Sequence, residues 1–78
     1  MAVRIFSTPS CVHCRHLKSY LRDRDVRFTE YDVSRDEHKS QEMYAKSRQH
    51  GVPVLDFNGT IVVGFDRAKV DRLIGGGH

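Results

Sequence analysis

The sequence predicts an α/β fold in which one mixed four-stranded sheet carries helices on both faces. Strand-like and helix-like segments follow one another in the order β-α-β-α-β-β-α. A helix separates the first two strands, which should therefore run parallel through a right-handed crossover. The last two strands flank Asn58-Gly59, a strong signal for a tight antiparallel hairpin. A chain of 78 residues forms a single domain with one such sheet.

The first half of the chain contains two predicted strands around one helix. Residues 2–6 are predicted to form a buried strand, and Thr8-Pro9-Ser10 is a turn signal in which serine can cap a helix. β-branched and aromatic residues predict the second strand over residues 26–33. The helix between them should span about residues 12–24, because three apolar residues recur at helical spacing: Leu17, Tyr20 and Leu21.

The second half begins with Ser34 and Glu37, whose spacing fits a capping box. They predict a helix over about residues 35–48 that covers one sheet face with few apolar side chains, namely Met43, Tyr44 and Ala45. Gly51-Val52-Pro53 breaks this helix before the hairpin strands at 54–57 and 60–63.

A last helix closes the predicted domain. Asp66 is its expected N-cap, and its inner face should carry Val70, Leu73 and Ile74. We expect residues 1–75 to form the domain and residues 76–78 to form a flexible C-terminal tail.

Composition indicates a soluble globular protein, since 38% of residues are hydrophobic and 29% are charged. Apolar runs reach only about five residues, too few for a membrane span, and no signal-peptide pattern opens the chain. We therefore expect a cytoplasmic monomer without membrane partners. The formal charge is +3, but acidic residues, Asp23 and Asp25, are interleaved with the basic ones, which are Arg15, Lys18, Arg22, Arg24 and Arg27. This pattern favours a solvated helix face over a nucleic-acid site.

The two cysteines, Cys11 and Cys14, lie where the first strand gives way to the first helix. Cys11 should sit at or just before the helix N-terminus, where unpaired N–H groups and the helix dipole favour a thiolate. Cys14 should lie one turn further on, from where it can reach back and close a disulfide. The pattern predicts that Cys11 attacks substrate and that Cys14 resolves the intermediate.

A metal site is the alternative for this segment, because His13 and His16 accompany the cysteines. Structural zinc commonly takes four ligands from two separated pairs, whereas this chain has one pair, and four residues on one turn cannot converge on one ion. We therefore assign no metal ligand. An intermolecular zinc site, a [2Fe-2S] cluster shared between two chains with glutathione, and a non-enzymatic adaptor role stay open as alternatives.

Three segments carry a resemblance to a known family. Residues 8–14, Thr-Pro-Ser-Cys-Val-His-Cys, resemble the active-site turn of glutaredoxins, which belong to the thioredoxin superfamily. Gly51-Val52-Pro53 resembles their Thr-Val-Pro loop, and residues 63–66, Val-Gly-Phe-Asp, resemble their Gly-Gly-x-Asp turn. The resemblance implies a thioredoxin-like fold. It also implies a cis Val52-Pro53 bond facing the cysteines, although X–Pro bonds in general favour trans.

The resemblance further implies an enzyme that reduces protein disulfides through Cys11 and Cys14. It implies a site for substrate or glutathione made of Thr8, Pro9, His13, Val52, Pro53, Gly64, Phe65 and Asp66. Val12 and the Gly64-Phe65 pair are similar to the NrdH redoxins, glutaredoxin-like proteins that reduce ribonucleotide reductase and take electrons from thioredoxin reductase.

Three departures from the family pattern predict weak glutathione recognition. Thr8, His13 and Val63 replace a lysine, a tyrosine and a glycine that usually help to hold glutathione, while Gln41 or Arg48 remains available for a carboxylate. No bound cofactor is expected, and the electron source is either glutathione or a thioredoxin-reductase-type donor. An ordinary glutathione-dependent glutaredoxin is the alternative. His13 either stabilises the thiolate when protonated or is a surface side chain.

Overall fold

The predicted order of elements is confirmed by the structure, a computed structural model that describes residues 2–75. The elements are β1 (Val3–Ser7), α1 (Val12–Asp23), β2 (Thr29–Asp32), α2 (Glu37–Ser47), β3 (Val54–Phe57), β4 (Thr60–Val63) and α3 (Arg67–Gly75). The predicted tail at residues 76–78 lies outside the described residues. Across residues 2–75, no helix has the length and apolar character needed to cross a bilayer.

The sheet has the strand order β2-β1-β3-β4, which places β1 and β3 at its centre. β1 runs parallel to β2 and antiparallel to β3, and β3 pairs with β4 in an antiparallel hairpin. The hairpin turns through Asn58 at φ 52° and Gly59 at φ 100°, both in the left-handed region that such two-residue turns require. Both predicted strand pairings are therefore confirmed.

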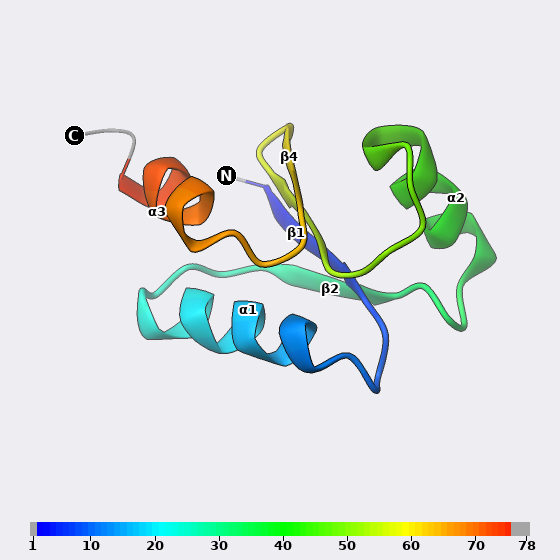
Figure 1. Ribbon diagram of the computed structural model, residues 1–78, viewed down its shortest axis with the longest axis horizontal. Coiled ribbons are helices and arrows are strands. Elements are labelled where there is room, and N and C mark those ends of the chain that lie inside the picture. The colour runs from blue at the N-terminus through cyan, green and yellow to red at the C-terminus, as the bar shows by residue number, and fades with distance from the viewer. Residues whose placement is uncertain (1, 76–78) are drawn as a thin grey trace.

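Helices cover both faces of the sheet, as predicted, with α1 and α3 on one face and α2 on the other (Figure 1). The face under α1 and α3 holds the larger core cluster, whose buried members are Val3, Ile5, Leu17, Tyr20, Leu21, Leu55, Phe57, Val62 and Val70. Leu73 and Ile74 pack against this cluster, which confirms the inner face expected for the last helix. The face under α2 holds the smaller cluster of Phe6, Met43 and Val54.

Tyr20 joins α3 to α1. Its hydroxyl donates a hydrogen bond to the Asp71 carboxylate, which raises the pKa of the phenol. The Arg24 guanidinium stacks 3.4 Å from the centre of the Tyr20 ring, and the Phe65 ring packs against it at 5.3 Å. One aromatic side chain thus holds α3 and the turn before it against α1.

The second strand is shorter than predicted, spanning Thr29–Asp32 instead of residues 26–33. Asp25 adopts φ 57°, and the Val26 N–H still bonds back to the Leu21 carbonyl at 3.0 Å. The chain is therefore completing the C-terminal turn of α1 where we expected a strand. Val26 and Phe28 nevertheless pack against the larger cluster, which explains their apolar character.

The predicted capping box at Ser34 and Glu37 is wrong. The N-cap of α2 is Asp36, whose carboxylate accepts the Lys39 N–H at 3.1 Å. Ser34 instead donates its N–H to the Asp32 carboxylate at 2.9 Å, forming a local turn. Because this local bond competes with capping, α2 begins at Glu37 and not at residue 35. It ends at Ser47, one residue early, where Arg48 takes the left-handed φ of 61°.

An ion pair helps to hold α2 on the sheet. Met43 is the one buried residue of this helix, so its apolar contact with the sheet is small. Lys46 donates to the buried Asp56 carboxylate of β3 at 2.6 Å and also pairs with Glu42 at 3.0 Å. Burial by itself would raise the pKa of Asp56. Hydrogen bonds from Lys46 and the Gly59 N–H outweigh burial and lower that pKa. Asp56 is therefore charged at neutral pH and stabilises the α2 contact.

We expect Asp56→Asn to lower the free energy of unfolding at pH 7 by about 1.5–3 kcal/mol, the usual contribution of a hydrogen bond to a charged group. Asparagine keeps an acceptor for the Gly59 N–H but removes the charge that faces Lys46. Urea denaturation followed by circular dichroism measures the change. Asp23→Asn is the matched control, because Asp23 is exposed and forms no ion pair within residues 2–75.

The same pair predicts a pH dependence. A carboxyl whose pKa is lowered by folding stabilises the native state above its unfolded pKa, and this contribution is lost as pH falls through the folded pKa. The stability difference between the parent protein and Asp56→Asn should therefore shrink below the ordinary value of 3.8 for this carboxyl. A difference that stays constant from pH 7 to pH 3 would contradict the ion pair.

Candidate active site

Cys11 caps the N-terminus of α1 with its own sulfur. Its backbone is extended at φ −84° and ψ 112°, and the Cys14 N–H donates to Cys11 Sγ at 3.1 Å. We expected that Ser10 could supply the cap, but Ser10 is exposed and the sulfur takes this role. An N–H donor and a helix N-terminus both favour the charged form of a thiol, so this position suits a thiolate at Cys11.

Cys11 and Cys14 form a disulfide, with their Cα atoms 5.2 Å apart. Cys11 is half-buried, whereas Cys14 is 1% exposed. Cys11 is therefore the accessible member of the pair, as expected for the attacking residue. The placement of Cys14 in the first turn of α1 is also confirmed.

Two distant loops meet the cysteine turn. The Val52-Pro53 bond is cis, as predicted, and the Val52 carbonyl oxygen lies 3.9 Å from Cys11 Sγ. The Gly64 N–H donates to the Pro53 carbonyl at 2.8 Å, which joins the turn after β4 to the same loop. Sequence-distant segments that carry predicted site residues thus converge on Cys11.

Other predicted residues take supporting positions around this centre. The Thr8 carbonyl accepts the Cys11 N–H at 3.3 Å, and Pro9 is exposed beside it. Gly64 has a φ of 77°, a conformation that favours glycine. The Asp66 carboxylate accepts the Lys69 N–H at 3.2 Å, which confirms Asp66 as the cap of α3.

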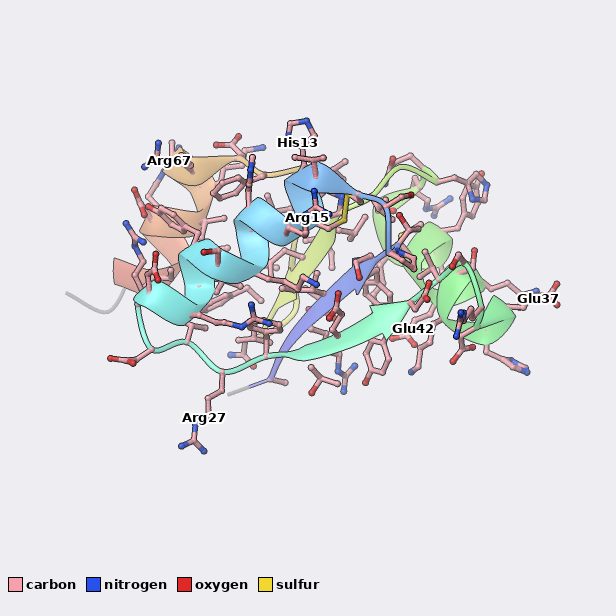
Figure 2. The ribbon with its side chains drawn as sticks, turned by 90° about the horizontal axis from the view of Figure 1, so that it is seen from below. His13, Arg15, Arg27, Glu37, Glu42 and Arg67 are labelled. Atoms are coloured by element: carbon pink, nitrogen blue, oxygen red, sulfur yellow. A yellow bond between two sulfur atoms is a disulfide. The ribbon has the colours of Figure 1, made fainter. Side chains whose placement is uncertain are left out.

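Phe65 and His13 differ in how they lie. Phe65 is half-buried and packs into the larger cluster, so its ring is directed to the core and not to the cysteines. His13 is exposed and points away from the protein (Figure 2). Its ring lies 6.3 Å from that of His16, and among the described residues it has no hydrogen bond to either cysteine. This geometry fits the surface alternative for His13.

A polar cluster lies beside the cysteine turn. Ser7 and Lys18 donate to Glu30 Oε2 at 2.6 and 2.7 Å. Partial burial alone would raise the pKa of Glu30, but these two hydrogen bonds outweigh burial and lower it. The cluster borders a hollow of about 360 Å³ lined by Ser7, Thr8, Pro9, Arg15, Lys18, Glu30 and Asp32. Across residues 2–75, no three His, Cys, Asp or Glu side chains gather in an arrangement for a metal ion.

Gln49 is a site residue that the sequence analysis missed. Its side-chain oxygen accepts the Gly51 N–H at 2.6 Å, and its Nε2 donates to the Gly51 carbonyl at 2.9 Å. Nε2 also lies 3.2 Å from the hydroxyl of Ser47, the last residue of α2. The amide therefore ties the loop before Val52 to the end of α2. No sequence signal marks this contact: a Cβ at Gly51 would lie 2.7 Å from the Gln49 oxygen, but that close approach exists only in the folded chain.

A family model described as Glutaredoxin matches residues 3–62, which span the sheet from β1 to β4. The chain belongs to the glutaredoxin family. This glutaredoxin is similar to an uncharacterized glutaredoxin-like 8.6 kDa protein in the rubredoxin operon of Clostridium pasteurianum. The two are 40% identical over 72 residues, covering 92% of this chain and 96% of the relative. The family and the cysteine pair together identify this protein as a thiol–disulfide oxidoreductase.

Solved structures show the same thioredoxin-like fold. NrdH-redoxin from Escherichia coli superposes with a TM-score of 0.84 at 23% identity, over 94% of this glutaredoxin and 95% of that chain. A glutaredoxin from Archaeoglobus fulgidus gives a TM-score of 0.86 at 22% identity, over 95% of this chain and 87% of the other. At these identities the likeness establishes the α/β fold predicted from the sequence.

We expect Gln49→Ala to speed hydrogen exchange at the Gly51 amide by about 5-fold, because losing a hydrogen bond of about 1 kcal/mol raises the open population accordingly. Exchange is followed residue by residue by NMR. Gln49→Glu keeps an acceptor for the Gly51 N–H and should exchange more slowly than Gln49→Ala. Gln41→Ala alters an exposed glutamine of α2 and is the matched control. Unchanged protection of Gly51 in Gln49→Ala would show that the Gln49 side chain does not hold the Gly51 amide.

Proposed function

We propose that this protein reduces disulfides in other proteins by dithiol exchange, with Cys11 attacking, Cys14 resolving and glutathione recognised only weakly. The observation that carries the proposal is the cap of α1. The sulfur of half-buried Cys11 accepts the N–H of Cys14, while the Cys14 side chain is buried beneath it. Cys11 is therefore the more accessible of the two cysteines, and Cys14 is shielded from a partner.

The proposed exchange has two steps. The Cys11 thiolate attacks one sulfur of a substrate disulfide, forms a mixed disulfide and releases the other substrate sulfur as a thiolate. The Cys14 thiolate then attacks Cys11 Sγ, which closes the Cys11–Cys14 disulfide and releases the second substrate thiolate. Two electrons pass from the cysteine pair to the substrate. Glutathione or a thioredoxin-reductase-type enzyme returns two electrons to the pair.

Val52 supplies the proposed contact with the substrate backbone. Among the described residues, 2–75, no hydrogen bond engages its N–H, and its carbonyl lies 3.9 Å from Cys11 Sγ. An extended substrate segment can pair with such free backbone groups as an added strand does. Thr8, Pro9 and Gly64 border this path in our proposal, and Pro53 holds Val52 beside the sulfur.

Weak glutathione recognition rests on three side chains. Thr8 offers no positive charge, His13 points away from the cysteines, and Val63 is 50% exposed where the family usually has glycine. Asp66 and the α3 N-terminus remain available for one glutathione carboxylate or amine. E. coli NrdH-redoxin is described as a glutaredoxin-like protein with a thioredoxin-like activity profile. We assign this chain a profile of the same kind, acting as a cytoplasmic monomer.

Substituting the two cysteines separately tests their roles. We expect Cys11→Ser to lower disulfide reduction to the uncatalysed rate, because the attacking thiolate is lost. Cys14→Ser should accumulate a mixed disulfide with substrate, visible as added mass in intact-protein mass spectrometry. Ser10→Ala is the matched control and should keep full activity. Alkylation that labels Cys14 before Cys11 at neutral pH would reverse the assignment.

Glutathione titration tests the proposed specificity. Loss of one charge-assisted contact weakens binding roughly 10- to 150-fold. Amide shifts of Val52 and Asp66 in Cys14→Ser should therefore stay unsaturated below millimolar glutathione. Adding Thr8→Lys should tighten binding by restoring a positive charge, while Lys69→Arg, which keeps its charge, should not.

Saturation at micromolar glutathione would instead establish an ordinary glutathione-dependent glutaredoxin. The electron donor is identified by supplying either glutathione with its reductase or NADPH with thioredoxin reductase. NADPH consumption is followed in both assays.

A further inference from the structure

All exposed large hydrophobic side chains in the described part of the chain lie next to the loops that meet at Cys11. Val12 is 48% exposed and follows Cys11 directly. Val63 is 50% exposed and precedes Gly64, which bonds to Pro53. Tyr44 is 44% exposed and stacks at 4.5 Å on His50, two residues before Val52. Exposed apolar side chains beside loops that meet can form an interaction surface.

Two cations near this end, Arg15 and Arg67, have no acidic partner among the described residues. Arg15 lines the hollow beside Thr8 and Pro9, where the other cation is already bound to Glu30. Ion pairs occupy the side chains of Arg4, Lys18, Arg24, Arg35, Lys39 and Lys46. Other cations of the described residues also form none, namely Arg22, Arg27, Arg48, Lys69 and Arg72, so the position of Arg15 and Arg67 is what distinguishes them.

Figure 2 shows how these charges are distributed. His13, Arg15 and Arg67 lie toward the side of the molecule that carries the cysteine turn, whereas Arg27 points away from the opposite side. The labelled acidic residues, Glu37 and Glu42, lie with α2. Asp66 is an acidic residue beside Gly64, and its carboxylate is already bonded to the Lys69 N–H. Glu30 and Asp32 line the hollow beside Arg15, but they pair with Lys18 and Arg35. Arg67 lies over the Tyr20 ring at 5.4 Å and has no acidic partner within residues 2–75. Arg15 and Arg67 are therefore available to acidic groups of a partner.

We infer that this surface docks an extended segment of a partner protein in which apolar residues adjoin the disulfide and acidic residues flank it. The inference rests on the proposed function and names the class of its substrate. Val12 and Val63 contact the apolar residues, and Arg15 and Arg67 attract the acidic ones. Complementary charge of this kind raises the rate of encounter more than it raises affinity, and salt screens it.

Two synthetic peptides test the inference. Both contain the same internal disulfide with valines beside the cysteines, and they differ in carrying either glutamates or lysines on both flanks. A fluorophore and quencher report disulfide opening by the pre-reduced protein. We expect the acidic peptide to react faster at low ionic strength, by about 1.4- to 5-fold for each exposed charge pair formed. This advantage should disappear in about 1 M salt, where the screening length is about 3 Å.

Charge-reversal variants assign the effect to this surface. Arg15→Glu and Arg67→Glu should each reduce the preference for the acidic peptide. Arg27→Glu makes the same charge change on the opposite side and should leave the preference intact. Val63→Ser should slow both peptides alike and independently of salt, because it removes apolar contact only. Circular dichroism checks that each variant is folded, and Arg15→Gln and Arg67→Gln replace any reversal variant that is not.

The outcomes separate this inference from the proposed function. If both peptides are reduced at equal rates, or if Arg67→Glu and Arg27→Glu have equal effects, the inferred preference for acidic segments is wrong. The proposed disulfide reductase activity is then still supported. Reduction of neither peptide, with simple disulfides also left intact, would overturn the reductase and the inference together. A salt-sensitive preference that depends on Arg15 and Arg67 supports both.

Discussion

The start of α1 has backbone N–H groups that need acceptors, and the sulfur of Cys11 provides one of them. This contact serves both the helix and the proposed reaction, because the cysteine whose sulfur caps the helix is also the more accessible of the pair. A serine or aspartate cap would satisfy the helix equally well, but it would provide no nucleophile for disulfide exchange. The position of Cys14 follows from the same contact, since its N–H is the donor. The two cysteines are therefore held together by the geometry of one helical turn.

The sheet brings the other two loops to this turn. β1 ends at the cysteine segment, and its antiparallel neighbour β3 begins just after Val52-Pro53. β4 pairs with β3 and ends at Gly64, so its last residues return to the same edge. The bond from the Gly64 N–H to the Pro53 carbonyl then joins the two loops directly. Loops separated by some forty residues meet because neighbouring strands place their ends together.

The face covered by α2 depends on polar contacts more than the opposite face does. α2 buries Met43 alone, so the pair between Lys46 and Asp56 supplements a small apolar contact. Beyond the helix, the Gln49 side chain forms hydrogen bonds with the N–H and the carbonyl of Gly51. The loop that presents Val52 is thus attached at one end to α2 and at the other to β3. Two large apolar side chains, Val63 and Tyr44, remain exposed, at 50% and 44%.

The sequence by itself determined the features that short segments encode. Asn58-Gly59 required a tight hairpin, the apolar spacing of α1 placed Cys11 at a helix start, and a helix between two strands made them parallel. Tertiary structure decided the features in which local preferences compete or distant side chains meet. The Asp32 carboxylate accepts a hydrogen bond from Ser34, and Asp36 caps α2 instead. The Phe65 ring packs against Tyr20 in the core. The pairing of Lys46 with Asp56 and the clamp of Gln49 on Gly51 depend on side-chain positions that no local pattern specifies. Propensity acts over a few neighbouring residues, whereas these contacts form only once the helices and strands are packed.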